Sequence, residues 1–283
     1  MLASYQPLNE KHGIVELLTA DGEALWSRTR DASFVPSATG KYLLSQPDPL
    51  NEVPVEVLDG RTGDTLWRGD SYPFAAQPLS EEALAHLSRG RLRIYAMATG
   101  EVLAERDLSE PFRESLSYTR WQLAVAADGS TVSVLGWASW PSHEAELWTF
   151  DRRLELRWSR SLEPGFPELV GVTEDGSKLC LKRKRGIRLY DNAAGTLLWQ
   201  VDGRFLNNRA VVTNRLIALR QVGNASEVFL LEEGGNLAQQ LTSPSVFTLK
   251  PGALRSGKTA AGTLVQIERQ DQKSFVRLLS EER

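Results

Sequence analysis

The chain has 283 residues, a formal net charge of −3, and 41% hydrophobic and 24% charged residues, as expected for a globular protein with a substantial core. This near-neutral balance lacks the basic character of a dedicated nucleic-acid binder, so no nucleic-acid partner is expected. Because Cys180 is the single cysteine, an internal disulfide is excluded and nothing indicates an oxidising compartment.

The N-terminal residues, MLASYQPLNEKHG, have neither the basic start nor the long apolar stretch of a secretory signal peptide. No apolar run along the chain approaches the length of a membrane span. The sequence therefore predicts a cytoplasmic protein without a membrane partner.

One pattern then recurs along the chain: an alternating apolar strand, a turn that ends in glycine, and a short strand with an apolar plug. Well-formed copies cover residues 15–26, 55–67, 92–104 and 187–199. A copy without the glycine covers 146–158, and one without Trp covers 228–239. The plug positions are Trp26, Trp67, Ala104, Trp158, Trp199 and Gln239. A spacing of about forty residues, with one insertion, indicates a repeat fold.

A second hairpin lies between these copies. It consists of a turn followed by a strand in which every second residue is apolar. It is seen at residues 37–45, 126–136, 173–182, 212–220 and 260–268. Each repeat therefore predicts about four short strands separated by Gly, Asp or Asn turns. Residues 79–87 resemble a helical turn, but their place in the repeat predicts a strand hairpin.

The turn chemistry is clearest in DGRTGDTLW, Asp59 to Trp67, and DNAAGTLLW, Asp191 to Trp199. Glycine takes a positive φ without steric cost, and the Asp side chain can accept backbone N–H bonds across the turn. The Trp that follows is a large apolar plug on a short outer strand, to be buried against a neighbouring sheet.

A single four-stranded sheet cannot bury both of its faces, whereas sheets stacked around an axis can. The sequence therefore predicts an all-β fold, a β-propeller of four-stranded blades, as one domain over residues 1–283. Seven second strands and seven third strands indicate seven blades. Six blades, with the two incomplete ends merged into one closing blade, is the alternative. In either case the two ends of the chain should meet.

The spacing acidic-x-x-[Thr/Ala]-Gly-x-x-Leu-Trp resembles the repeat of the pyrroloquinoline-quinone-type, or quinoprotein-like, β-propellers. The resemblance spans the whole chain, with its best copies at 55–67 and 187–199. That family contains quinone dehydrogenases and also scaffolds such as an outer-membrane assembly factor. The dehydrogenases need a calcium ion, an acidic base and often adjacent cysteines. With one cysteine in this chain, the resemblance implies the fold and not that activity.

No constellation for catalysis or metal binding is found in the sequence. The histidines His12, His86 and His143 have no metal-ligand spacing, and no Asp-rich calcium loop is present. The fragment SGKT, Ser256 to Thr259, lacks the earlier glycine of a phosphate-binding loop and precedes a strand. The sequence thus favours a protein without a cofactor, a metal ion or catalytic residues.

Two local features are candidates for partner binding. The first is the insertion GWASWPSHEAELW, in which Trp137, Trp140 and His143 are expected on the loop between second and third strands. Loop aromatics on a rigid scaffold often bind partners, but these could instead fold back between blades. The second is the cationic run Lys182, Arg183, Lys184 and Arg185. It could contact an anionic partner, or it could be a solvated strand edge.

These features favour an interaction scaffold that binds a protein or peptide through loops on one face. The alternative is a small-ligand binder, or a hydrolase or lyase, that uses the central channel. The innermost strands, which are expected to line that channel, consist mostly of small and apolar residues, with Glu168 and Glu174 as exceptions. A third reading is a module of a larger assembly, in which a partner strand completes an end blade.

Overall fold

The computed structural model describes residues 2–5, 13–18, 21–30, 34–37, 39–45, 54–71, 74–139, 144–163, 167–183, 186–203, 205–212, 216–221, 226–231, 236–243, 246–247, 264–270 and 273–279. The regular secondary structure within these residues consists of β-strands and two short 3-10 turns, so the predicted all-β class is confirmed. No helix in this part of the chain has the length and apolarity needed to cross a membrane.

The strands form antiparallel sheets in which each strand pairs with its neighbours in the sequence. Among the described residues, five sheets have four strands, and the first and last have three. Grouped by sheet, the strands are β1 Leu2–Tyr5, β2 Gly13–Leu18 and β3 Ala24–Arg30; β4 Phe34–Pro36, β5 Tyr42–Ser45, β6 Pro54–Asp59 and β7 Thr65–Ser71; β8 Phe74–Pro78, β9 Ala83–Ser88, β10 Arg91–Ala96 and β11 Val102–Asp107; β12 Thr119–Val125, β13 Thr131–Ala138, β14 Ala145–Asp151 and β15 Leu156–Ser161; β16 Glu168–Val172, β17 Lys178–Arg183, β18 Gly186–Asp191 and β19 Leu197–Asp202; β20 Phe205–Val212, β21 Leu216–Gln221, β22 Ser226–Leu231 and β23 Leu237–Ser243; and β24 Val246–Phe247, β25 Leu264–Gln270 and β26 Lys273–Leu279.

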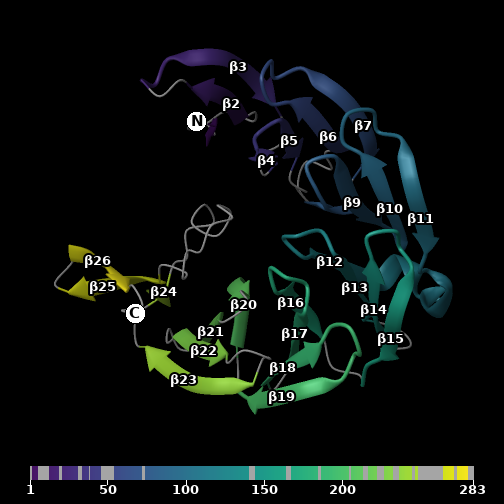
Figure 1. Cartoon of the computed structure of the whole chain (residues 1–283), viewed down its shortest axis with the longest axis vertical. Helices are drawn as coiled ribbons and strands as arrows, with labels where there is room; N and C mark the ends of the chain where they lie inside the picture. Colours follow the sequence, from purple (N-terminus) through teal and green to yellow (C-terminus); the bar gives the residue numbers. More distant parts are fainter. Residues whose placement is uncertain are drawn as a thin grey trace.

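The sheets follow one another around an arc, which is the arrangement of a β-propeller (Figure 1). The innermost strands of neighbouring sheets contact each other, as β8 does with β12 and β12 with β16. The outermost strands, among them β11, β15 and β19, form the rim (Figure 1). The first and last sheets lie on either side of the opening of the arc, so the predicted meeting of the two ends is not seen in this arrangement (Figure 1).

The up-and-down order of the strands gives the propeller two unlike faces. Turns that follow an innermost or a third strand lie on one face, which we call the turn face. Connections that follow a second or an outermost strand lie on the other face, which we call the loop face. On the turn face the two turns of a sheet are bonded, as the Gly60 amide donates to the Lys41 carbonyl at 2.7 Å.

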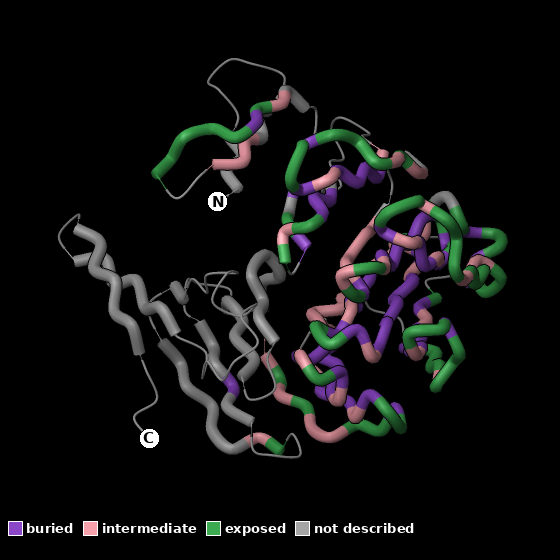
Figure 2. The backbone as a smooth tube through the Cα atoms, turned by 45° about the horizontal axis from the view of Figure 1, so that its top comes forward, coloured by how far each residue is buried: buried purple, intermediate pink, exposed green. Residues whose placement is uncertain are grey.

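The core lies between the sheets. The middle strands β9 and β13 are buried along nearly their whole length, because each face of a sheet packs on a neighbouring sheet. By contrast, the outermost strands β11 and β15 are largely exposed. Buried and exposed stretches therefore alternate along the described chain (Figure 2). Residues 79–87, which resembled a helical turn, contribute to the buried strand β9, as the repeat predicted.

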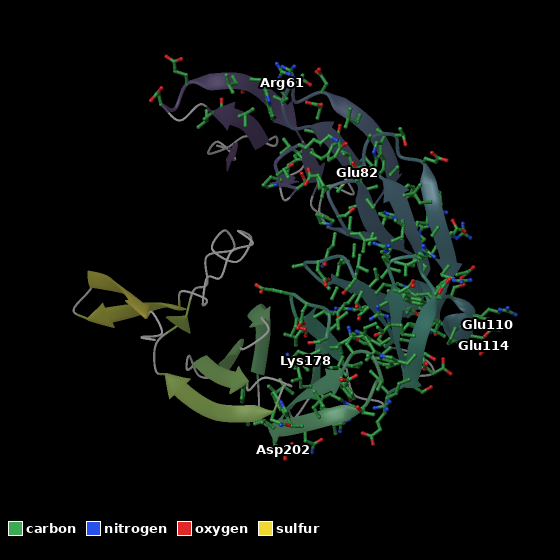
Figure 3. The ribbon with its side chains drawn as sticks, viewed as in Figure 1. Arg61, Glu82, Glu110, Glu114, Lys178 and Asp202 are labelled. Atoms are coloured by element: carbon green, nitrogen blue, oxygen red, sulfur yellow. The ribbon has the colours of Figure 1, made fainter. Side chains whose placement is uncertain are left out.

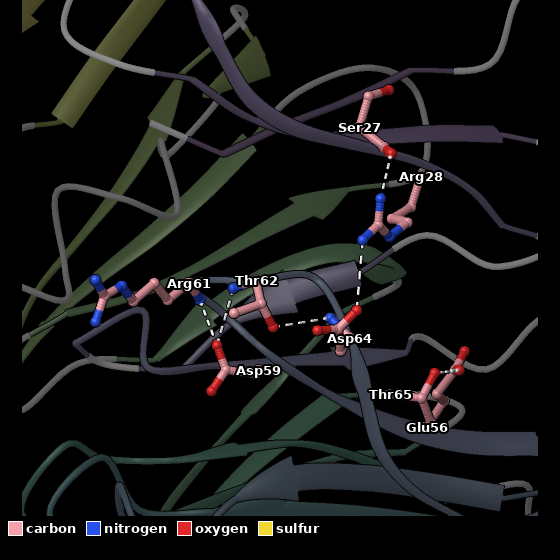
Figure 4. A network of polar contacts seen from close by, with 8 residues as sticks. All are labelled: Ser27, Arg28, Glu56, Asp59, Arg61, Thr62, Asp64 and Thr65. Carbon is pink, nitrogen blue, oxygen red and sulfur yellow. Dashed lines mark hydrogen bonds and ion pairs between the residues drawn. The ribbon is translucent and has the colours of Figure 1, made fainter.

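The repeat turns have the predicted chemistry. Asp59 Oδ1 accepts hydrogen bonds from the amides of Arg61 and Thr62 at 2.8 and 2.9 Å (Figure 4). Asp191 Oδ1 accepts the equivalent bonds from the amides of Ala193 and Ala194. Each turn ends in a glycine of positive φ, which a residue with a side chain rarely adopts.

The Trp plugs join neighbouring sheets through these same glycines. A Cβ added at Gly100 would lie 2.8 Å from the Trp67 ring of the preceding sheet, and Gly63 and Gly195 have the same relation to Trp26 and Trp158. The Trp67 indole N–H also donates to the Met97 carbonyl at 2.7 Å. The glycine is therefore required by its turn and also by the ring that covers it.

One junction uses a different pair of residues. At the plug position of β11 stands Ala104, and the turn that it faces has Leu154 in place of the glycine, with a φ of 61°. Leu154 is 1% exposed and belongs to the core cluster against which Ala104 packs. The Arg106 Nε donates to the Leu154 carbonyl at 2.9 Å. At this junction a small plug and a large turn residue thus replace the large Trp and the small glycine of the other junctions.

Candidate partner-binding face

Three of the residues predicted for partner binding, Trp137, Lys182 and Arg183, lie toward the loop face of the sheets β12–β15 and β16–β19. Trp137 lies on β13 itself, and not on the loop after it, which corrects the expectation from the sequence. Lys182 and Arg183 end the strand β17. The other predicted residues, Trp140, His143, Lys184 and Arg185, lie outside the described residues.

Trp137 is half-buried and combines two environments. It packs against a core cluster that spans β12–β15 and β16–β19 and includes Leu135 and Leu179. On the same strand pair, Trp137 is the register partner of Arg120 on β12. The exposed Arg120 guanidinium lies over the indole, with Cζ 5.5 Å from the ring centroid. The ring thus contributes to the sheet junction, and the exposed guanidinium lies over it.

The connector from β11 to β12 is the second element of this face. It contains two 3-10 turns, η1 (Glu110–Phe112) and η2 (Leu116–Tyr118), which the repeat pattern did not predict. Phe112 anchors it, because this fully buried ring contacts Trp121 and Trp148 at centroid distances of 5.2 and 6.1 Å. Glu110 and Glu114 project outward from the connector (Figure 3).

The end of the connector lies beside Ser139, the first residue after β13, where the two continue the pairing of β12 with β13. The Ser139 amide donates to the Tyr118 carbonyl at 3.3 Å, although the two residues come from different connections. Next to this bond the connector presents Tyr118, which is 53% exposed, and Leu116, which is 36% exposed. Sequence reasoning missed both residues, and the signal that could have found them was the unusual length of the connector within the repeat.

The cationic run is partly neutralised by acidic neighbours. Lys182 Nζ lies 3.6 Å from Glu168 Oε2, and the Arg183 guanidinium lies 3.5 Å from Glu163 Oε2. Arg183 also donates to the Glu163 carbonyl at 2.7 Å. Burial raises the pKa of Glu168, and the nearby Lys182 ammonium partly offsets this effect. These two cations therefore have carboxylate partners within the chain, which weakens their case as an anion site.

Polar groups on the innermost strands serve the junctions. The Gln77 side chain on β8 exchanges two hydrogen bonds with the β12 backbone, at the Leu123 carbonyl and the Val125 amide. Gln122 on β12 accepts a bond from the Leu169 amide of β16 at 2.7 Å. In the part of the chain that the structure describes, no group of three His, Cys, Asp or Glu side chains is placed to hold a metal ion.

The family model described as "Outer membrane protein assembly factor BamB", a PQQ-repeat model, matches residues 5–139. Over these residues the match bears out the resemblance to the PQQ-type repeat β-propellers that the turn motif indicated. No curated protein matches the sequence of the chain.

Several solved propellers share the fold. The complex of KlAtg21 with the coiled coil of AgAtg16 matches with 10% identity and a TM-score of 0.59, over 100% of this chain and 99% of that one. A chain of the Mitotic Checkpoint Complex matches with 13% identity and a TM-score of 0.59, over 96% and 82%. The propeller domain of Myceliophteria thermophila Cps50 (Swd1) gives 16% identity and a TM-score of 0.50, over 85% and 82%. At these identities the likeness establishes the fold alone.

Proposed function

We propose that the chain is a non-catalytic β-propeller scaffold of the cytoplasm that binds a protein or peptide partner through its loop face. The observation that carries the proposal is that the connector, residues 108–118, ends beside Ser139, the first residue after β13, at the bond between Ser139 and Tyr118. Exposed apolar side chains, Leu116 and Tyr118, lie beside that bond. Such side chains on a rigid scaffold are common in protein interfaces.

The comparisons support a partner of this kind. Two of the solved propellers named above come from protein assemblies, one with a coiled coil and one a checkpoint complex. Propellers with this fold can therefore serve as platforms for other proteins. For the present chain we propose the same role at the sheets β12–β15 and β16–β19.

The test is chemical cross-linking of the full chain in a cell extract, with the linked proteins identified by mass spectrometry. A double variant, Leu116→Ser with Tyr118→Ala, should abolish specific cross-links at the loop face, as should Trp137→Ala with Trp140→Ala. The matched control is Arg61→Gln, at an exposed residue of the turn face (Figure 3). A cross-linked partner that is unchanged by both loop-face variants would contradict the site.

A second candidate is binding of a small ligand in the central channel, and Glu168 is the observation that favours it. Its carboxyl group stands on an innermost strand, and burial raises its pKa, which is a common property of functional carboxyl groups. Elemental analysis and mass spectrometry of the purified chain test this candidate. A metal ion or small molecule that co-purifies, and is lost in Glu168→Gln, would support it over the scaffold.

The proposal also includes the number of blades. We propose that the partner-binding form is a closed ring of seven blades, whose first blade lacks its innermost strand and whose last lacks its outermost strand. The strand order supports it, since β3 aligns with the outermost strands and β24 with the innermost strands. A cryo-EM structure of the chain with its partner tests this count, and a ring of six blades would contradict it.

A further inference from the structure

We propose that Arg120 is the specificity-determining residue of the loop face, and that it binds an acidic side chain of an extended partner peptide. A neighbouring apolar residue of the same peptide would pack on Leu116 and Tyr118. This inference rests on the proposed scaffold function and adds the chemistry of the partner.

The charge of Arg120 favours an acidic partner. Its exposed guanidinium lies over the Trp137 ring, and no carboxylate of the described residues lies within ion-pair distance of it. Some other arginines have such a partner, among them Arg68 with Glu56 and Arg183 with Glu163. Arg120 therefore offers N–H donors to a carboxylate that another molecule supplies.

The position of the Arg120 guanidinium over the Trp137 ring also preorganises it for binding. A guanidinium stacked on an aromatic ring keeps its N–H groups in the plane and directed past the edge of the ring, where a carboxylate can accept two parallel bonds. Trp137 is itself fixed by the core cluster beneath it. Binding therefore does not have to immobilise a freely moving arginine side chain, which is normally an entropic cost of association.

The connector that leads to Arg120 exposes apolar side chains. Register pairs Thr119 with Ala138 and Arg120 with Trp137, so the end of the connector and the end of β13 lie side by side. The exposed Tyr118 and Leu116 lie two and four residues before Arg120 in the chain. An acidic residue that is followed or preceded by an apolar residue is complementary to this combination of charge and apolar surface.

A second stacked arginine provides the matched control. Arg160 on β15 lies over the ring of the buried Tyr190, with Cζ 5.5 Å from the centroid. It lies over its ring in the same way but stands on the outermost strand β15, whereas Leu116 and Tyr118 belong to the connector that leads into the innermost strand β12. If the position of an arginine over an aromatic ring were enough to bind acidic peptides, Arg160 and Arg120 would contribute equally to the peptide affinity.

The experiment uses the full chain to select binders from a phage-displayed library of short random peptides. We expect recovered peptides to share Asp or Glu close to an apolar or aromatic residue. One such peptide and its Glu→Gln counterpart are then titrated by fluorescence anisotropy. Arg120→Gln and the peptide Glu→Gln change should each weaken binding about tenfold or more, as expected for a charge-assisted hydrogen bond, and together hardly more than either alone. The peptide affinity of Arg120→Lys should lie between those of the parent chain and Arg120→Gln. Arg160→Gln should leave the affinity unchanged.

Several results would overturn the inference. Recovered peptides without acidic residues would do so, as would equal losses from Arg120→Gln and Arg160→Gln. Binding to phosphatidylserine vesicles or single-stranded DNA that exceeds peptide binding, and that needs Arg120, would assign the residue to another partner class. Peptides that depend on Tyr118 but not on Arg120 would overturn this inference and leave the scaffold function standing. Failure to recover any peptide, together with failure of cross-linking, would overturn both.

Discussion

Two junctions between neighbouring sheets solve the same packing problem with opposite residues. Where β7 faces the next sheet, a large plug, Trp67, covers a turn glycine, Gly100. Where β11 faces the next sheet, the plug is the small Ala104 and the turn carries the buried Leu154. Both junctions combine one large and one small residue, and the two differ in which side supplies the large one.

The difference also shows what each solution costs. Gly100 takes its positive φ of 72° without strain, whereas Leu154 takes a φ of 61° with a side chain. A left-handed conformation costs a residue with a Cβ about 1–2 kcal/mol. Burial of the Leu154 side chain offsets that cost by about 1.5–3 kcal/mol. A leucine at this position of the turn is therefore tolerated only where the facing plug is small.

The largest expected effect comes from breaking a Trp–Gly junction at the glycine. Gly100→Ala introduces a Cβ at 2.8 Å from the Trp67 ring in addition to the strain of its positive φ. We expect a loss of about 3 kcal/mol in the free energy of unfolding, from backbone strain and overpacking together. Urea denaturation followed by circular dichroism measures it.

Gly22 supplies the control for that measurement. It has the same role in its turn and a φ of 87°, but a Cβ added there meets no atom within 4 Å. Gly22→Ala should therefore cost only the backbone strain, about 1 kcal/mol. Equal losses for the two variants would show that the covering ring contributes nothing to the requirement for glycine.

The exchange itself can be reversed as a double-mutant cycle. Ala104→Trp alone should collide with Leu154, and Leu154→Gly alone should leave a cavity, at about 2 kcal/mol each. The double variant recreates the Trp–Gly pair, so we expect it to recover about 1–3 kcal/mol relative to the sum of the single losses. Additive losses would mean that the two positions are independent. Ala104→Trp combined with Gly22→Ala, at a distant turn, should be additive.

Much of the fold follows from local chemistry that a sequence reveals. In the turn at Asp59, the Asp carboxylate accepts hydrogen bonds from amides two and three residues later, and the glycine that ends the turn follows closely. Because these residues are near one another in the sequence, the turns and strands could be predicted. The Ala104–Leu154 exchange could not, because each residue is explained only by its partner in the next sheet. A single sequence gives no sign of which distant positions share a junction.

The candidate site was predicted less well, for a related reason. Trp137 was placed on a loop because its spacing broke the repeat, but the insertion begins after β13 and leaves Trp137 on the strand. The pairing of Lys182 and Arg183 with Glu168 and Glu163 depends on the register and the chain path, which composition does not specify. The exposed Tyr118 belongs to a 3-10 turn that is anchored by the buried Phe112, a tertiary contact.

Among the Trp junctions themselves a smaller difference can be measured. The Trp67 indole N–H donates to the Met97 carbonyl at 2.7 Å, whereas the buried Trp26 Nε1 has no hydrogen-bond partner in the described structure. Trp67→Phe should therefore destabilise the chain by about 1 kcal/mol more than Trp26→Phe, which is the contribution of one hydrogen bond. Urea midpoints of the two variants give this difference, and equal midpoints would contradict it.

The smallest effect concerns a junction on the turn face and its dependence on pH. The Glu81 carboxylate accepts hydrogen bonds from the hydroxyls of Ser37 and Thr39 in the preceding sheet, both at 2.7 Å. Burial alone would raise the pKa of Glu81, but these bonds favour the carboxylate and leave the pKa below its ordinary value of 4.5. A carboxyl group whose pKa is lower in the folded state stabilises the fold above its unfolded pKa. That contribution disappears as the pH falls through the folded pKa.

Glu81→Gln should accordingly be less stable than the parent chain at neutral pH, and the difference should shrink as the pH falls well below 4.5. Urea midpoints measured over this pH range test it. The matched control is Glu82→Gln, the adjacent exposed carboxyl group (Figure 3), which removes the same charge without touching Ser37 or Thr39. If both variants lose stability with the same pH dependence, the effect reflects net charge. If only Glu81→Gln does, the bonds between neighbouring turns contribute to the junction, as the Trp plugs do nearer the rim.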